Sequence, residues 1–91
     1  MIVAILVTVK GQVQGVGFRA FVHRTAITLG ISGEVWNAPD GSVMVHAQHA
    51  DEAHLYAFVR LLADGPGIVE EIDTAESSAI EGTGFRIGVS R

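Results

Sequence analysis

The sequence has 91 residues, of which 48% are hydrophobic and 18% are charged, with a formal net charge of −4 and no cysteine. This length and apolar content predict one globular domain over residues 1–91 and exclude an intrinsically disordered chain. The acidic balance argues against a nucleic-acid-binding surface, and without cysteine the chain has neither disulfides nor thiolate metal sites. Because reduced compartments disfavour disulfides, we expect a cytoplasmic protein.

The first part of the chain predicts a strand, a glycine-rich loop and a helix. Ile2–Lys10 is apolar on both faces, which is typical of a central strand, and it is too short for a membrane span and lacks the basic start of a signal peptide. A loop over Gly11–Gly17 follows. Apolar residues then recur at helical spacing from Phe18 to Leu29, and Gly30 is expected to end this helix.

A hairpin is predicted next. Alternating apolar residues indicate strands over Ile31–Asn37 and Ser42–Gln48, and the turn Ala38–Gly41 (APDG) joins them. Proline presets the first turn dihedral and glycine can adopt a positive φ, so the two strands are expected to be antiparallel neighbours.

The remaining segments predict a second helix and two strands. The helix covers Asp51–Ala63, begins at Asp51 as its N-cap and stops before Gly65–Gly67. The strands cover Ile68–Ala75 and Gly84–Ser90, with a loop over Glu76–Thr83 between them.

This order of elements predicts an α+β fold. It is the split βαβ pattern (βαββαβ) with an extra C-terminal strand, that is, a ferredoxin-like α/β sandwich. Right-handed crossovers place two helices on one face of a mostly antiparallel sheet. The alternation slips between Val69 and Ile72, which indicates a β-bulge. The other face of the sheet is expected to be open to solvent, with four side chains on it: Glu34, Trp36, Met44 and His46.

The glycine-rich loop and Arg19 are the clearest functional signal. A glycine turn before a helix directs several backbone N–H groups toward one point, where the helix dipole favours an anion. Arg19 lies in the first turn of that helix, where a cation opposes the dipole at a cost of about 0.3 to 1 kcal/mol. A phosphate held between the N–H groups and the guanidinium would explain this placement, whereas a plain tight turn would not need it.

A dinucleotide fingerprint also matches this loop formally. The pattern is Gly15-x-Gly17-x-x-Ala20, with Glu34 near the spacing of a ribose-binding acid. Glu34, however, precedes a tight hairpin and does not end a second parallel strand. Nicotinamide binding is therefore rejected.

Two segments of the chain resemble the signatures of the acylphosphatase family. They are Gly11–Arg19 (GQVQGVGFR) and Gly33–Asn37 (GEVWN) with the following Asp40–Val43 (DGSV). Gly65-Pro66 and Phe85–Ile87 also fall where that family has similar residues, so the resemblance spans nearly the whole chain.

The resemblance implies an enzyme that hydrolyses the carboxyl-phosphate bond of a small acyl phosphate, without cofactor or metal. It implies that Arg19 binds the phosphate and that Asn37 orients the attacking water. The phosphate cradle would be formed by the backbone of Gln14, Gly15, Val16, Gly17 and Phe18. We expect a monomer that contacts neither nucleic acid nor membrane.

Trp36 departs from the family pattern, because arginine or a smaller residue usually precedes the asparagine. Strand alternation predicts that Trp36 faces away from Asn37, as partial cover of the open face or as a partner surface. His23 is interpreted as a surface residue. His46, His49 and His54 with Asp51 have no standard metal-ligand spacing, so we predict no metal site.

Two alternatives share this fold. Acylphosphatase-like modules also form the N-terminal part of the carbamoyltransferases that mature nickel-iron hydrogenases, and Val16–Val22 is similar to such modules. The other alternative is a non-catalytic module that binds phosphate without turnover.

Overall fold

The computed structural model describes all 91 residues and has seven elements of secondary structure. They are β1 (Val3–Gln12), α1 (Phe18–Leu29), β2 (Ser32–Asn37), β3 (Val43–His49), α2 (Glu52–Leu62), β4 (Ile68–Ser77) and β5 (Phe85–Ile87). The order βαββαββ and the ferredoxin-like arrangement confirm the fold class predicted from the sequence. Neither α1 nor α2 has the length and hydropathy of a membrane-spanning helix.

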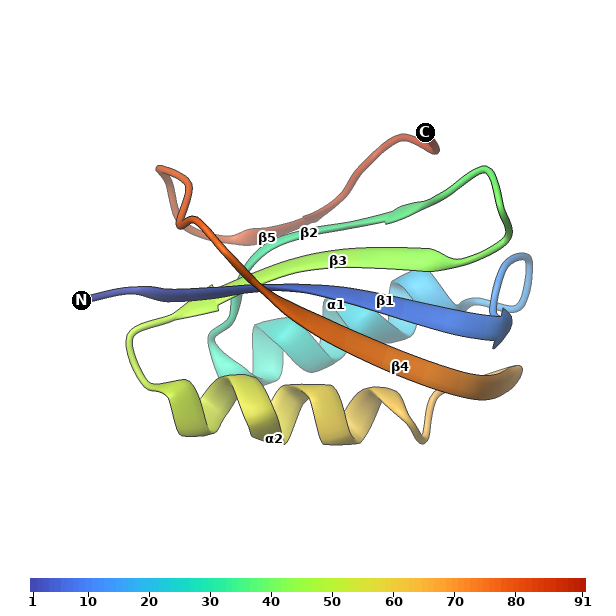
Figure 1. Ribbon diagram of the computed structural model, residues 1–91, viewed down its shortest axis with the longest axis horizontal. Coiled ribbons are helices and arrows are strands. Elements are labelled where there is room, and N and C mark those ends of the chain that lie inside the picture. Colours follow the sequence, from blue (N-terminus) through green and yellow to red (C-terminus); the bar gives the residue numbers. More distant parts are fainter.

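The five strands form one sheet in the order β4-β1-β3-β2-β5. Three neighbouring pairs are antiparallel, and β2 pairs with β5 in parallel. Both helices lie on one face of the sheet (Figure 1). The loop after β1 and the turn between β2 and β3 lie at the same end of the sheet, where the C-terminus also ends (Figure 1). This end carries the residues that the sequence singled out.

The core lies between the sheet and the two helices. Alternate residues of β1 and β3 point into it, and Val7, Val9 and Val45 have no exposed surface. From α2 the core receives Leu55, Phe58 and Leu62, which recur at helical spacing and are likewise fully buried. Burying a side chain of this size stabilises the fold by about 1.5 to 3 kcal/mol.

Each helix has a cap at the residue that the sequence predicted. Gly30 caps α1 in the left-handed conformation, with φ 68°. Asp51 caps α2 by accepting a hydrogen bond from the backbone N–H of Ala53 at 2.9 Å. Both caps confirm the predicted boundaries.

The bulge predicted in β4 is present at Glu70. Lys10 pairs with Glu71 and Gly11 pairs with Val69, so Glu70 is the extra residue. The bulge explains why Val69 and Ile72, three residues apart, both pack against the core, since strict alternation would place them on opposite faces.

The expectation of an open second face is only partly correct. His46 and Gln48, on this face of β3, are 8% and 6% exposed. The Gln48 side chain contacts the loop between β4 and β5: its Nε2 donates to the Ile80 carbonyl at 2.8 Å and its Oε1 accepts from the Ile80 N–H at 2.9 Å. The loop after β4 therefore covers part of the face, a long-range packing that strand alternation could not predict.

Strand lengths also differ from expectation. β1 runs two residues further, to Gln12, and β4 runs to Ser77, because the two pair along their whole length. β5 is shorter than predicted and covers only Phe85–Ile87. The longer β1 shortens the glycine-rich loop and anchors its start.

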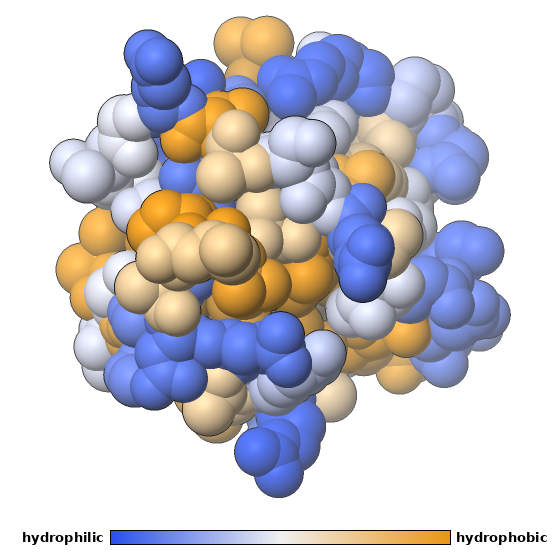
Figure 2. Space-filling model, turned by 60° about the vertical axis from the view of Figure 1, so that its left-hand side comes forward, coloured by the Kyte–Doolittle hydropathy of each residue, from blue (hydrophilic) through white to orange (hydrophobic).

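The end of the molecule opposite the glycine-rich loop has exposed apolar side chains. They are those of Met1, Ile2 and Ile80. Figure 2 views the molecule from that side and shows apolar atoms near the middle of the face, with hydrophilic groups around them. The apolar side chains at this end are far from the glycine-rich loop.

Candidate active site

The loop between β1 and α1 forms a turn that only glycine adopts easily. Gly15 and Gly17 have φ values of 74° and 84°. A methyl group at either position would meet nothing within 4 Å, so the backbone conformation and not space requires glycine. Gly17 is the N-cap of α1, provides no side-chain cap, and no acidic residue follows in the first turn. The first N–H groups of α1 therefore have no side-chain partner.

Arg19 lies in this first turn and is half-buried. Its guanidinium makes no hydrogen bond and no ion pair within the protein, and Arg24 and Arg60, which also lack partners, are exposed. A partly desolvated, unpaired guanidinium beside free helix N–H groups is electrostatically unfavourable until an anion binds. The arrangement can bind a phosphate, whose oxygens would accept from both sets of donors.

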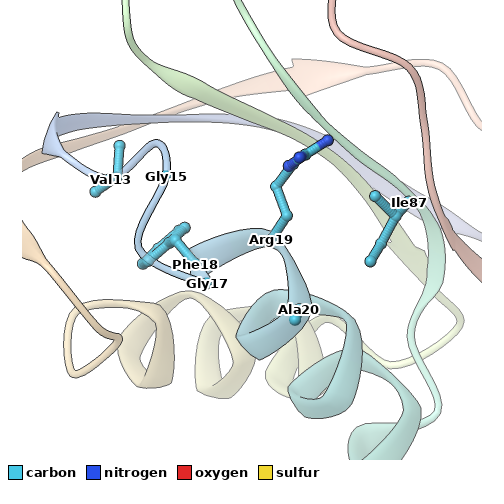
Figure 3. Close-up of a pocket in the computed structure, with 7 residues that line it drawn as sticks. All are labelled: Val13, Gly15, Gly17, Phe18, Arg19, Ala20 and Ile87. Carbon is cyan, nitrogen blue, oxygen red and sulfur yellow. The ribbon is translucent and has the colours of Figure 1, made fainter.

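A pocket of about 190 Å³ surrounds Arg19. In Figure 3 the Arg19 side chain rises from the start of α1, between the glycine-rich loop on one side and Ile87 of β5 on the other. The residues that line it are Val13, Gly15, Gly17, Phe18, Arg19, Ala20 and Ile87. Arg19 is the only charged residue among them.

Asn37 lies at the end of β2, close to this pocket. It lines a neighbouring pocket of about 340 Å³ together with Gln14, Ala38, Pro39, Ser90 and Arg91. Its side-chain Oδ1 is the one buried side-chain polar atom of the protein without a hydrogen-bond partner. A buried unpaired carbonyl oxygen costs about 1 to 3 kcal/mol, so a polar group such as a water is expected to bind it.

Gln14 lines the second pocket and connects the glycine-rich loop to the hairpin. Its Nε2 donates hydrogen bonds to the carbonyl oxygens of Ala38 and Ser42, at 2.8 and 2.9 Å. These bonds tie the glycine-rich loop to the turn that follows Asn37. The loop and Asn37 are thus held together by side-chain contacts as well as by the sheet.

The turn after Asn37 is fixed by Asp40. Its Oδ1 accepts from the Ser42 hydroxyl at 2.6 Å and from the Ser42 N–H at 3.0 Å. The hydrogen bond from the Ser42 side chain, followed by that from its backbone, lowers the pKa of Asp40 below its ordinary value. The carboxylate form therefore holds the turn in place at neutral pH.

The acylphosphatase family profile matches residues 5–87. The chain belongs to the acylphosphatase family. An acylphosphatase from Nocardioides sp. is 44% identical over 77 residues, which cover 82% of this chain and 77% of the relative. The crystal structure of acylphosphatase from Bacillus subtilis is 36% identical, has a TM-score of 0.87 and matches 97% of this chain and 99% of its own. At this similarity the chain is an acylphosphatase enzyme, a hydrolase.

A longer protein also contains a similar domain. The crystal structure of full-length HypF, in its phosphate- and nucleotide-bound form, is 31% identical with a TM-score of 0.88. The match covers 99% of this chain and 12% of HypF. The acylphosphatase fold thus occurs both as a small enzyme and as part of a much larger protein.

The predicted site residues of this acylphosphatase line two different pockets, except Val16. Gly15, Gly17, Phe18 and Arg19 line one pocket, and Gln14 and Asn37 line the other. Val16 lines neither, and its side chain lies near Gly67. The roles assigned to these residues stay predictions. Sequence reasoning missed the Gln14 side-chain tether, because its partners are 24 and 28 residues away and no local pattern marks them.

Trp36 lines neither pocket, and the C-terminal residue Arg91 lies over its ring. The Arg91 guanidinium lies 3.9 Å from the centre of the Trp36 ring and makes contacts of 3.4 Å with the carboxylate of Glu34. The Arg91 N–H donates to the Asn37 carbonyl at 2.9 Å. Trp36 therefore helps to anchor the C-terminal segment beside Asn37.

The histidines lie apart from the two pockets. His23 packs beside Phe85, with 6.2 Å between ring centres. His49 and His54 stack at 4.4 Å, and the Nδ1 atom of His54 is 3.1 Å from the Asp51 carboxylate. His46, on the other side of the sheet, bonds to Gln48 at 2.9 Å.

Proposed function

We propose that this acylphosphatase hydrolyses small acyl phosphates to a carboxylate and inorganic phosphate, with Arg19 and Asn37 as its catalytic residues. The observation that carries the proposal is the half-buried, unpaired Arg19 in one pocket with the glycines of an uncapped helix start. A phosphoryl group is the ligand that these donors fit best, because it accepts hydrogen bonds from several directions at once.

The backbone N–H groups of residues 14–18 and the Arg19 guanidinium hold the phosphoryl oxygens. Phosphoryl transfer needs mainly positioning and stabilisation of charge on these oxygens, and both sets of donors supply this. Acyl phosphates are reactive mixed anhydrides, so no covalent intermediate with the enzyme is required.

Asn37 orients the attacking water. Its amide does not take up a proton near neutral pH, so it positions the water by hydrogen bonds and does not act as a base. Water attacks phosphorus, a P–O bond to water forms, and the P–O bond to the acyl group breaks to release the carboxylate. The proton of the water passes to a phosphate oxygen of the substrate.

The test is hydrolysis of benzoyl phosphate by the wild-type enzyme and two variants. We expect Arg19→Gln and Asn37→Ala each to lower kcat/KM by at least about a hundredfold, as for loss of one transition-state donor elsewhere. Arg19→Gln should also raise KM, because Arg19 binds ground state and transition state alike, whereas Asn37→Ala should act mostly on kcat.

Arg24→Gln is the matched control, because Arg24 is an exposed, unpaired cation on the same helix. It should retain wild-type kinetics, and all three variants should keep the wild-type circular dichroism spectrum. Substantial activity in either site variant would overturn the catalytic assignment. Phosphate binding without any turnover by the wild type would instead favour a non-catalytic binding module.

A second candidate is favoured by the likeness to HypF, in which a matching domain is a small part of the chain. Under this alternative the sequence is one domain of a longer carbamoyltransferase, and the same pocket handles carbamoyl phosphate. A full-length transcript distinguishes the two: a reading frame that ends after Arg91 supports the small enzyme, and one that continues into further domains supports the alternative.

A further inference from the structure

The pocket around Arg19 has two chemically different walls. On one side lie the backbone of Gly15 and Gly17 and the start of α1, which offer N–H groups (Figure 3). On the other side Ile87 faces Arg19, with Ala20 below (Figure 3). Ile87 is one of the exposed large hydrophobic residues of the protein, at 46% exposure. Phosphate binding involves the first wall and leaves the second without a function.

Ile87 and Ala20 line the same pocket as Arg19. Of the apolar residues that line this pocket, Val13 and Phe18 are buried, whereas Ile87 and Ala20 are exposed. An acyl group on a phosphate held at Arg19 can therefore contact Ile87 and Ala20.

We infer that Ile87 and Ala20 form an acyl-group subsite that favours acyl phosphates with a short alkyl chain, such as butyryl phosphate, over acetyl phosphate and over acyl phosphates with a second charged group. This inference rests on the proposed function. Apart from Arg19, which the phosphate occupies, no charged or polar side chain lines this pocket, so a second charge on the acyl group would find no partner. The volume of about 190 Å³ is below the roughly 300 Å³ at which pockets begin to hold drug-sized ligands, so the acyl group is small.

The test compares butyryl phosphate with acetyl phosphate. Butyrate and acetate are leaving groups of nearly equal basicity, so the ratio of their kcat/KM values reports contacts of the two extra methylenes. For the wild-type enzyme we expect a ratio of about four, which corresponds to two methylenes that are half-buried at the subsite.

Two isosteric variants of Ile87 separate apolar contact from shape. Ile87→Val keeps an apolar branched side chain and should keep most of the preference for butyryl phosphate. Ile87→Thr has the same shape as the valine variant but carries a hydroxyl, so its ratio should fall toward one. Val89→Thr is the control, because Val89 is 78% exposed and lines no pocket; its ratio should equal that of the wild type.

The outcomes distinguish the inference from the proposed function. If the wild-type enzyme hydrolyses neither substrate, the proposed function fails. If it hydrolyses both at a ratio near one, or if the threonine and valine variants of Ile87 have equal ratios, the subsite is wrong while the function stands. A purely structural effect of Ile87→Thr would lower kcat/KM for both substrates equally and leave the ratio unchanged, which also overturns the inference.

Discussion

Asn37 has a buried oxygen that no other group of the protein satisfies. Most buried polar groups in folded proteins are hydrogen-bonded, and an unpaired one lowers stability. An enzyme can retain such a group when its partner arrives with the substrate, as the oriented water would here. Gln14, its neighbour in the same pocket, is different, because both hydrogen bonds of its amide are made within the protein.

This contrast predicts opposite effects of two substitutions. Asn37→Ala should leave the free energy of unfolding unchanged or raise it by up to about 1 to 3 kcal/mol while activity is lost, because no hydrogen bond within the protein is broken and a buried unpaired oxygen is removed. Gln14→Ala should lower the free energy of unfolding by about 1 kcal/mol, because two hydrogen bonds between the loop and the hairpin disappear. Urea unfolding followed by tryptophan fluorescence measures both.

The control is the m value, the slope of the free energy of unfolding against urea concentration. An unchanged m value shows that both variants unfold in the same way as the wild type. If Asn37→Ala lowers the free energy of unfolding by about 2 kcal/mol or more, which is about the cost of a broken buried hydrogen bond, then Asn37 stabilises the fold. Its role as a functional group would then lack support.

Some residues of the site could be predicted from the sequence more easily than others. Arg19 stands out from local chemistry alone, as a cation at the helix end that disfavours cations. Asn37 has no such signal, and only the resemblance to acylphosphatases pointed to it. Ile87 was visible only as an alternating strand residue, because its place opposite Arg19 depends on the parallel pairing of β5 with β2.

At the scale of elements, α2 begins at an ionisable cap. The hydrogen bond from the Ala53 N–H is the main cause that lowers the pKa of Asp51 below its ordinary value, and His54 adds to it. A carboxyl whose pKa is lower in the folded protein stabilises the fold above its unfolded pKa, and this stability is lost as the pH falls through the folded pKa. The contribution of Asp51 should therefore be lost in acid.

Asp51→Ala and Asp51→Asn separate the cap from its charge. Asparagine is as good an N-cap as aspartate but does not titrate. Between pH 5 and pH 2, the Tm difference between wild type and Asp51→Ala should shrink, whereas the difference between Asp51→Asn and Asp51→Ala should stay constant. Thermal unfolding followed by circular dichroism tests this, and a wild-type difference that does not change with pH would contradict it.

The elements themselves were largely predictable, because helices and strands follow local periodicity and caps. Even the bulge at Glu70 appeared in the sequence, as a slip of alternation between Val69 and Ile72. What could not be predicted was which loop covers which face. Gln48 contacts a loop through Ile80, which is 32 residues away, and no local sequence pattern indicates a contact over such a distance.

The whole molecule has a net charge of −4, yet its candidate site is built to bind an anion. Attraction of the substrate must then be local, from Arg19 and the N–H groups, and not from the overall field. Binding to the folded state alone would raise the stability of the whole domain by linkage. Ligand-dependent unfolding therefore tests the site without any catalytic assay.

Inorganic phosphate at ten times its Kd should stabilise the wild-type protein by about 1.4 kcal/mol, equivalent to a rise in Tm of roughly 6 to 11 °C for a domain of this size. Phosphate also stabilises proteins non-specifically, by exclusion from their surface, so two controls are needed. Sodium chloride at matched ionic strength should give a much smaller rise, and Arg24→Gln should behave as the wild type. Arg19→Gln should lose the saturable part of the rise and keep only the small, linear dependence on phosphate concentration. If Arg19→Gln shows the same saturable rise as the wild type, phosphate binds elsewhere, and the pocket around Arg19 is not the anion site.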